Sequence, residues 1–238
     1  MKLVIFDVDG TLIFSEKRDS RAFAATYEKI YRRAFPTIDW RTYPHVTDTT
    51  IFDSVIRQHF GRPSSEPEVR RFQEHYVALL EDNRRAAPRD YLEVPGARQA
   101  VAALEQDSRY LIGVATGGWK WSAEVKLRHV GITIDRRLFS GADGKASREH
   151  IIEEVIGYAG EIHGNSFDKV VYIGDAIWDV DTTRNLQLGF VGVRRQGDFS
   201  LLQREGARHV IRDYLDYDGF LRLVDEAVPP GERNSLLE

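Results

Sequence analysis

Cysteine is absent from the 238 residues, and no apolar run approaches the roughly 20 residues that a membrane span needs. The first absence excludes disulfides, thiolate metal sites and cysteine nucleophiles. The N-terminus offers one lysine and a short apolar run before charge begins, so it does not resemble a secretion signal. The net charge of −4 gives no basis for a nucleic-acid or anionic-membrane partner. We therefore expect a cytoplasmic protein that binds neither nucleic acid nor membrane.

Short apolar runs rich in β-branched residues recur along the chain and are typical of strands buried on both faces of a parallel sheet. They cover residues 3–6, 110–115, 170–173 and 190–193. Helical patterns lie between or after them, at residues 97–105, 122–129, 149–158 and 178–185. This alternation predicts right-handed crossovers and an α/β fold with a parallel sheet.

One long segment breaks the alternation, because it contains helical patterns and no convincing buried strand. The patterns cover about residues 21–34, 49–60 and 66–85, and Pro88 and then Pro95-Gly96 mark the return to the main fold. We predict a core domain made of residues 1–15 and 89–238, with a helical domain inserted at residues 16–88.

The first apolar run ends in two carboxylates, in the stretch Asp7-Val8-Asp9-Gly10-Thr11. Residues two apart on an extended backbone face the same way, so the two charges would repel each other if they were buried unpaired. A hard cation removes this conflict, and Mg²⁺ is the ion that all-oxygen ligands favour. Gly10 allows backbone N–H groups to approach an anion closely. The alternative is an ordinary pair of aspartates in a solvated turn.

Two later stretches carry groups suited to phosphate. Thr116-Gly117-Gly118 follows the second predicted strand, so the threonine hydroxyl and the Gly117 N–H are candidate donors to a phosphate oxygen. The alternative for Thr116 is a simple helix N-cap. Lys145 lies in a glycine-rich loop, where it either neutralises a phosphate and an aspartate or is an ordinary surface lysine.

A further acidic pair follows the third predicted strand, at Asp175 and Asp179. A spacing of four places both side chains on one face of a starting helix. Helix N-termini favour acidic residues in any case, but a strand that leads directly into Gly174-Asp175 indicates a metal site. Ligands of parallel α/β sheets bind beyond the carboxyl ends of the strands, which is where these positions fall.

Taken in order, these positions resemble the haloacid dehalogenase superfamily of phosphohydrolases, and within it the phosphoglycolate-phosphatase-like branch. The residues that carry the resemblance are Asp7-Val8-Asp9-Gly10-Thr11-Leu12, Thr116, Lys145, and Gly174-Asp175 with Asp179. The resemblance implies a Rossmann-like three-layer core, with the segment at 16–88 as the superfamily's helical cap.

The stretch after Lys145 departs from that branch. Pro-x-Pro-Asp usually follows the lysine, whereas this chain has Ala146-Ser147-Arg148-Glu149. The sequence therefore leaves open whether Lys145 or Arg148 supplies the positive charge beside the phosphate.

The resemblance implies a Mg²⁺-dependent phosphatase that hydrolyses a small phosphorylated metabolite through an aspartyl-phosphate intermediate. Asp7 would be the nucleophile, and Asp9 would be the general acid and base. The catalytic set so implied is Asp7, Asp9, Thr116 and Lys145. The metal set is Asp7, Asp9 through its backbone carbonyl, Asp175 and Asp179, and the substrate-binding set is Gly10, Thr116, Gly117 and Lys145. The partner is then a small phosphorylated molecule, and the protein is expected to be a monomer or homodimer.

Four other functions share parts of this pattern. A phosphosugar mutase of the same fold also keeps Asp9, so the sequence does not separate it from a phosphatase. A carbon–halogen hydrolase needs neither a second acid nor magnesium, so Asp9 argues against it. A phospho-accepting signalling module of the receiver type, or a binding module without turnover, belongs to another class. A receiver has no inserted domain and phosphorylates a middle strand, whereas Asp7 follows the first one.

Overall fold

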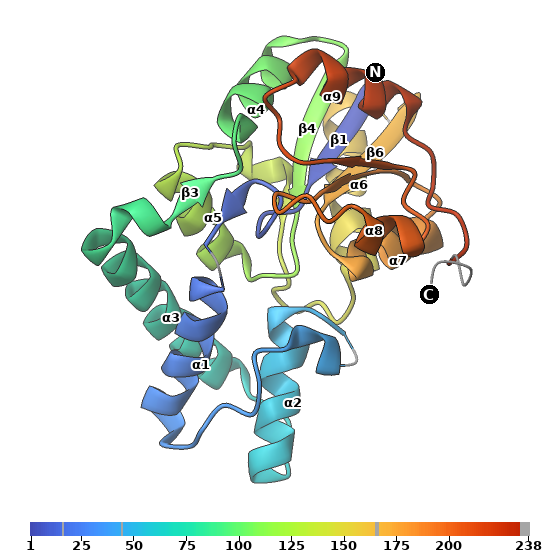
Figure 1. The fold of residues 1–238 in the computed structure, drawn as a ribbon. Helices are drawn as coiled ribbons and strands as arrows, with labels where there is room; N and C mark the ends of the chain where they lie inside the picture. Colours follow the sequence, from blue (N-terminus) through green and yellow to red (C-terminus); the bar gives the residue numbers. More distant parts are fainter. Residues whose placement is uncertain (16, 44, 165–166, 234–238) are drawn as a thin grey trace.

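The computed structural model describes residues 1–15, 17–43, 45–164 and 167–233. A six-stranded sheet lies at its centre, in the order β5-β4-β1-β6-β7-β8, and all of its neighbouring strands run parallel (Figure 1). Its strands are β1 (Lys2–Phe6), β4 (Tyr110–Ala115), β5 (Phe139–Ser140), β6 (Lys169–Gly174), β7 (Gly189–Val193) and β8 (His209–Ile211). Because β1 pairs with both β4 and β6, the residues that follow these three strands emerge side by side.

Helices cover both faces of this sheet. One layer contains α4 (Ala97–Gln106), α5 (Lys120–His129) and α9 (Tyr217–Glu226), and the other contains α6 (Arg148–His163), α7 (Ile177–Asn185) and α8 (Ser200–Arg204). Strand β1 contacts both layers. Val4 and Phe6 pack in the apolar cluster on the side of α4, α5 and α9, and Leu3 and Ile5 pack in the cluster on the side of α6, α7 and α8. This alternation explains the unbroken apolar run in the sequence and confirms the predicted three-layer α/β core.

The segment between β1 and β4 holds three long helices beyond the carboxyl ends of the strands (Figure 1). They are α1 (Arg18–Tyr31), α2 (Asp48–Phe60) and α3 (Glu66–Ala86). We call the segment that contains these three helices the insert. Short 3₁₀ helices η1 (Trp40–Thr42), η2 (Pro88–Asp90) and η3 (Arg136–Leu138) complete the helical elements. Residue 16, where we predicted the insert to begin, lies outside the described residues.

A two-stranded antiparallel ladder closes the base of the insert. It joins β2 (Ile13–Phe14), on the way out of the core, to β3 (Leu92–Glu93), on the way back. The ladder fixes the two connections side by side, so the insert leaves and re-enters the core at one place. The exact domain boundaries stay a prediction.

Aromatic side chains pack the insert against the sheet. The Trp119 indole, which comes from the loop after β4, is fully buried and stacks on Phe23 of α1 with ring centroids 5.8 Å apart. Phe52 of α2 and Phe72 of α3 meet the same indole edge-on at 6.0 and 5.7 Å. Trp119 therefore belongs to the apolar core of the insert and to that of the sheet.

No helix within the described ranges is both long and apolar enough to cross a membrane.

Candidate active site

The loops that follow β1, β4 and β6, together with the insert, enclose a cavity of about 540 Å³. Asp7, Asp9 and Gly10 line it from the loop after β1, Thr116 from the loop after β4, and Asp175 from the loop after β6. The structure therefore brings together most of the predicted site residues, as expected for groups at the carboxyl edge of a parallel sheet.

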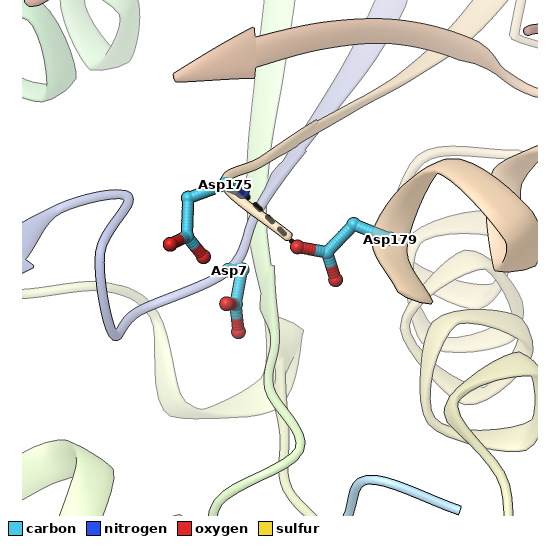
Figure 2. A group of neighbouring side chains, drawn as sticks. All are labelled: Asp7, Asp175 and Asp179. Atoms are coloured by element: carbon cyan, nitrogen blue, oxygen red, sulfur yellow. Dashed lines mark hydrogen bonds between the residues drawn. The ribbon is translucent and has the colours of Figure 1, made fainter. Parts of the chain in front are cut away.

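Asp7, Asp175 and Asp179 form one acidic group, and a ligand oxygen from each lies within 4.8 Å of the others (Figure 2). The turn into α7 positions Asp179, whose Oδ2 accepts hydrogen bonds of 3.0 Å from the backbone N–H groups of Asp175 and Ala176. Asp7 is 4% exposed, and its Oδ1 has no hydrogen-bond partner. A buried carboxylate oxygen without a hydrogen bond, in a cluster of carboxylate oxygens, suits a hard cation.

The pKa values of these carboxylates also indicate a cation site. Burial raises the pKa of Asp7 to about 7, with Arg148 opposing the rise and Asp179 and Asp9 adding to it. Burial, together with the charges of Asp179 and Asp7, also raises the pKa of Asp175 well above its ordinary value. Three close carboxylates repel each other when charged, so a bound cation would favour their ionised forms.

Gly10 makes room for this group. Its φ of +82° lies in the left-handed region, and a Cβ built there would collide with the carboxylate of Asp175. Glycine is therefore required at this position for two reasons, backbone conformation and close approach.

Arg148 is the cation beside the acidic group. It is the first residue of α6 and is 8% exposed, and its Nη2 lies 2.6 Å from Asp179 Oδ1 and 3.4 Å from Asp7 Oδ1. The same nitrogen donates to the Tyr172 hydroxyl at 3.2 Å. A Cβ on Gly117 would overlap the Arg148 guanidinium, so the absence of a side chain at Gly117 gives the arginine its space.

Lys145 lies elsewhere. Its Nζ is 3.0 Å from Glu154 on α6, and the lysine is not among the residues that line the cavity. The structure therefore places Arg148, rather than Lys145, next to Asp7.

Thr116 is buried in the cavity wall, and its Oγ1 accepts a hydrogen bond of 3.3 Å from the Gly118 N–H. Helix α5 begins only at Lys120, and Trp119 occupies its N-cap position. Thr116 is therefore not the cap of that helix, and it lines the same cavity as Asp7.

The two aspartates of the opening stretch have different environments. The Asp9 carboxylate is not part of the acidic group; both of its oxygens accept hydrogen bonds from Lys126 Nζ, at 2.9 and 2.7 Å. Lys126 lies on α5 and is almost completely buried. The sequence did not predict this role for Lys126. Its spacing of three residues from Ala123 places both on the same side of the helix, but a lysine at that spacing is ordinarily at the surface.

The insert adds two more acids to the cavity wall, Asp19 on α1 and Asp48 on α2. Burial raises the pKa of Asp19, with Lys126 opposing the rise and Asp9 adding to it. Burial likewise raises the pKa of Asp48 to about 7, and its Oδ2 accepts a hydrogen bond of 3.0 Å from the Trp119 N–H. Neither position carries a signal in the sequence, because only the packing of the insert on the core brings them here.

Hydrogen bonds hold the start of α2, and the residues just before it, against the core. The Asp48 N–H donates to the Gly117 carbonyl at 2.7 Å, and the Trp119 indole N–H donates to Thr49 Oγ1 at 3.0 Å. Arg148 Nη1 donates to the Val46 carbonyl at 3.3 Å. The insert thus contacts the same loop that carries Thr116.

Two arginines after β7 also line the cavity. Arg194 Nη1 lies 3.4 Å from the backbone oxygen of Asp175, to which it donates, and the Arg195 guanidinium lies 4.0 Å above the Phe14 ring. The cavity therefore has both cationic groups and carboxylates on its core side, and the insert adds further carboxylates.

Comparison with known proteins places this arrangement in context. A search of the curated proteins finds no match. Among solved structures, a hydrolase from Pseudomonas syringae is 22% identical with a TM-score of 0.68, and the alignment covers 95% of this chain and 99% of that one. A predicted phosphatase from Clostridium acetobutylicum is 20% identical, with a TM-score of 0.57 and coverages of 94% and 98%.

The protein CbbY from Rhodobacter sphaeroides, solved in complex with phosphate, is 18% identical with a TM-score of 0.63 and coverages of 89% and 94%. At these identities the structures show a shared fold. The sequence itself matches the model of the haloacid dehalogenase-like hydrolases over residues 1–186. The chain therefore belongs to the haloacid dehalogenase-like hydrolase family.

Proposed function

We propose that the protein is a Mg²⁺-dependent phosphatase that hydrolyses a small phosphorylated metabolite through an aspartyl-phosphate on Asp7. The observation that carries this proposal is the buried Asp7 carboxylate, which lines the cavity and has one oxygen free of hydrogen bonds. A carboxylate held in that way, with cationic and hydroxyl groups around it, suits nucleophilic attack on phosphorus.

Two displacements complete the reaction. In the first, an Asp7 oxygen forms a bond to phosphorus while the bond from phosphorus to the leaving oxygen breaks, and Asp9 gives a proton to that oxygen. In the second, Asp9 takes a proton from water, the water oxygen attacks phosphorus, and the bond to Asp7 breaks. Asp9 then holds a proton again, and inorganic phosphate leaves.

The transferred group is stabilised by donors at the same edge of the sheet. Arg148 supplies the fixed positive charge, because it contacts Asp7 whereas Lys145 pairs with Glu154. The Thr116 hydroxyl and the Gly117 N–H are the neutral donors to the phosphate oxygens. Donors fixed in advance act most strongly where negative charge spreads during the displacement.

The metal role falls to Asp7, Asp175 and Asp179, whose oxygens fit a hard cation. When bound, Mg²⁺ supplies positive charge that reduces the repulsion between the carboxylate and the phosphate. The Asp9 backbone carbonyl remains a candidate further ligand.

The insert, with proposed boundaries at residues 16–88, acts as a cap that excludes water and contacts the non-reacting part of the substrate. The cavity volume of about 540 Å³ suits a small metabolite. The resemblance to the phosphoglycolate-phosphatase-like branch makes 2-phosphoglycolate one substrate to test. Phosphosugars belong in the same panel, since a mutant of CbbY has been solved in complex with xylulose-1,5-bisphosphate.

Phosphate release from 4-nitrophenyl phosphate and from a panel of phosphorylated metabolites tests the proposal. We expect turnover with Mg²⁺, none after EDTA, and loss of nearly all activity in Asp7→Asn. Asp181→Asn is the matched control, because Asp181 is an exposed acid of the same helix as Asp179 and pairs with Arg184. Retention of more than a few per cent of activity in Asp7→Asn would refute the nucleophile assignment. Transfer of phosphate to another hydroxyl, without its release, would indicate a mutase.

A further inference from the structure

Lys126 is an unusual lysine, because its ammonium group is buried among carboxylates of the cavity wall. Its side chain is 6% exposed, and its Nζ donates to both oxygens of Asp9, at 2.9 and 2.7 Å. A buried ammonium group is costly unless it is paired and hydrogen-bonded. Asp9 provides that pairing, and in return a carboxylate held through both oxygens loses most of its rotational freedom.

The same ammonium group lies between the core and the insert. Asp19, on the first turns of α1, has Oδ2 at 3.9 Å from Lys126 Nζ, and that oxygen also accepts a hydrogen bond of 2.7 Å from the Ser15 hydroxyl. The other Asp19 oxygen, Oδ1, is buried without a hydrogen-bond partner. Lys126 is thus shared between the loop after β1 and the insert, and it is closer to Asp9.

We propose that Lys126 is a positioning residue: in the acid step its ammonium group keeps one Asp9 oxygen, and so holds the carboxyl in the orientation from which the other, protonated oxygen gives its proton to the leaving oxygen. This inference rests on the acid role proposed for Asp9. The competing explanation is a buried ion pair that only stabilises the packing of α5 against the insert. The two explanations predict different effects on kcat/KM when Lys126 is replaced. A positioning role predicts a larger loss for a substrate whose leaving oxygen needs a proton, and a purely structural role predicts the same loss for every substrate.

Leaving-group dependence provides the test, using 4-nitrophenyl phosphate and phenyl phosphate with the Mg²⁺-loaded enzyme. The two esters differ by one nitro group. Nitrophenolate departs without help from an acid, whereas phenolate benefits from protonation. The quantity to compare is kcat/KM, since it reports the first displacement and not the later hydrolysis of the intermediate.

We expect Lys126→Met to lower kcat/KM for phenyl phosphate at least about tenfold more than for 4-nitrophenyl phosphate, a part of the ~10²–10⁴-fold that general acids contribute. Lys126→Gln keeps an N–H donor and should fall between Lys126→Met and the unmodified enzyme in this selectivity. Equal losses for the two esters, or no loss for either, would overturn the proposal. Circular dichroism and thermal unfolding establish that each variant folds, and Lys126→Gln carries the test if Lys126→Met does not.

Two further variants separate this inference from the proposed function. Asp9→Asn should show the same selectivity as Lys126→Met, and the double variant should show no more than Asp9→Asn alone. If Asp9→Asn lowers kcat/KM equally for both esters, the acid role of Asp9 fails. If Asp9→Asn is selective and Lys126→Met is not, only the positioning role fails. Lys120→Met is the matched control, because Lys120 starts the same helix and donates to the Arg136 and Phe139 carbonyls, away from the cavity.

Discussion

Asp48 offers a quantitative check on the electrostatics of the cavity wall. Its pKa is raised from 3.8 to about 7, first by burial, with Lys126 and the Trp119 N–H opposing the rise. A carboxyl whose pKa is raised on folding is more stable in its protonated form in the folded protein. Its contribution to stability is therefore fully present below pH 3.8 and is lost as the pH rises through about 7.

The substitution Asp48→Asn removes this loss and keeps an oxygen that can accept from the Trp119 N–H. The interval from 3.8 to about 7 corresponds to at most about 4 kcal/mol of unfolding free energy above pH 7. Between pH 5 and pH 8, the advantage of the variant over the unmodified protein should grow by about 3 kcal/mol, since each pH unit contributes about 1.4 kcal/mol until the pKa is reached.

Urea unfolding of both proteins at pH 5, 6, 7 and 8, in the same Mg²⁺-containing buffers, measures this growth. Asp107→Asn is the control, because Arg109 lowers the pKa of that surface carboxyl to about 2. Its stability difference should not change over this range, where Asp107 is ionised in both folded and unfolded protein. An Asp48→Asn advantage that is the same at pH 5 and pH 8 would refute the reasoning.

Two other predictions concern the acidic group and its neighbours. Arg148→Met should lower kcat/KM for phosphate release by about 10²–10³-fold, and Lys145→Met by less than about tenfold, because only Arg148 contacts Asp7. A larger loss in Lys145→Met than in Arg148→Met would reverse the assignment. Gly10→Ala should raise the Mg²⁺ concentration for half-maximal activity at least about tenfold, since the new Cβ collides with Asp175. Gly61→Ala, which has a similar φ of +68° and nothing within 4 Å, should leave that concentration unchanged.

The sheet was predictable where its strands are long and apolar. The runs at 3–6, 110–115, 170–173 and 190–193 all correspond to strands, with bounds that differ by one residue at most. Strands β5 and β8 were missed because two or three residues are too few to show a period. Helix α9 was missed although Phe220 and Val224, four residues apart, are both buried on one side.

The site was predictable as far as it lies in the ends of those strands. Asp7, Thr116 and Asp175 follow strands directly, so their meeting follows from the parallel sheet. The charged contacts made from helices were not predictable in the same way. Nothing in the sequence shows that Lys126 turns toward Asp9, or that Arg148 rather than Lys145 reaches Asp7, because both outcomes depend on how helices α5 and α6 are packed.

The position of Trp119 has a consequence for how the molecule unfolds. Its indole is buried between the insert and the sheet, and losing a buried tryptophan costs about 3–5 kcal/mol in proteins. The insert and the sheet cannot separate without exposing that ring to water. We therefore expect them to unfold as one cooperative unit, so that a change that weakens helices α1 to α3 also lowers the stability of the strands that precede the acids.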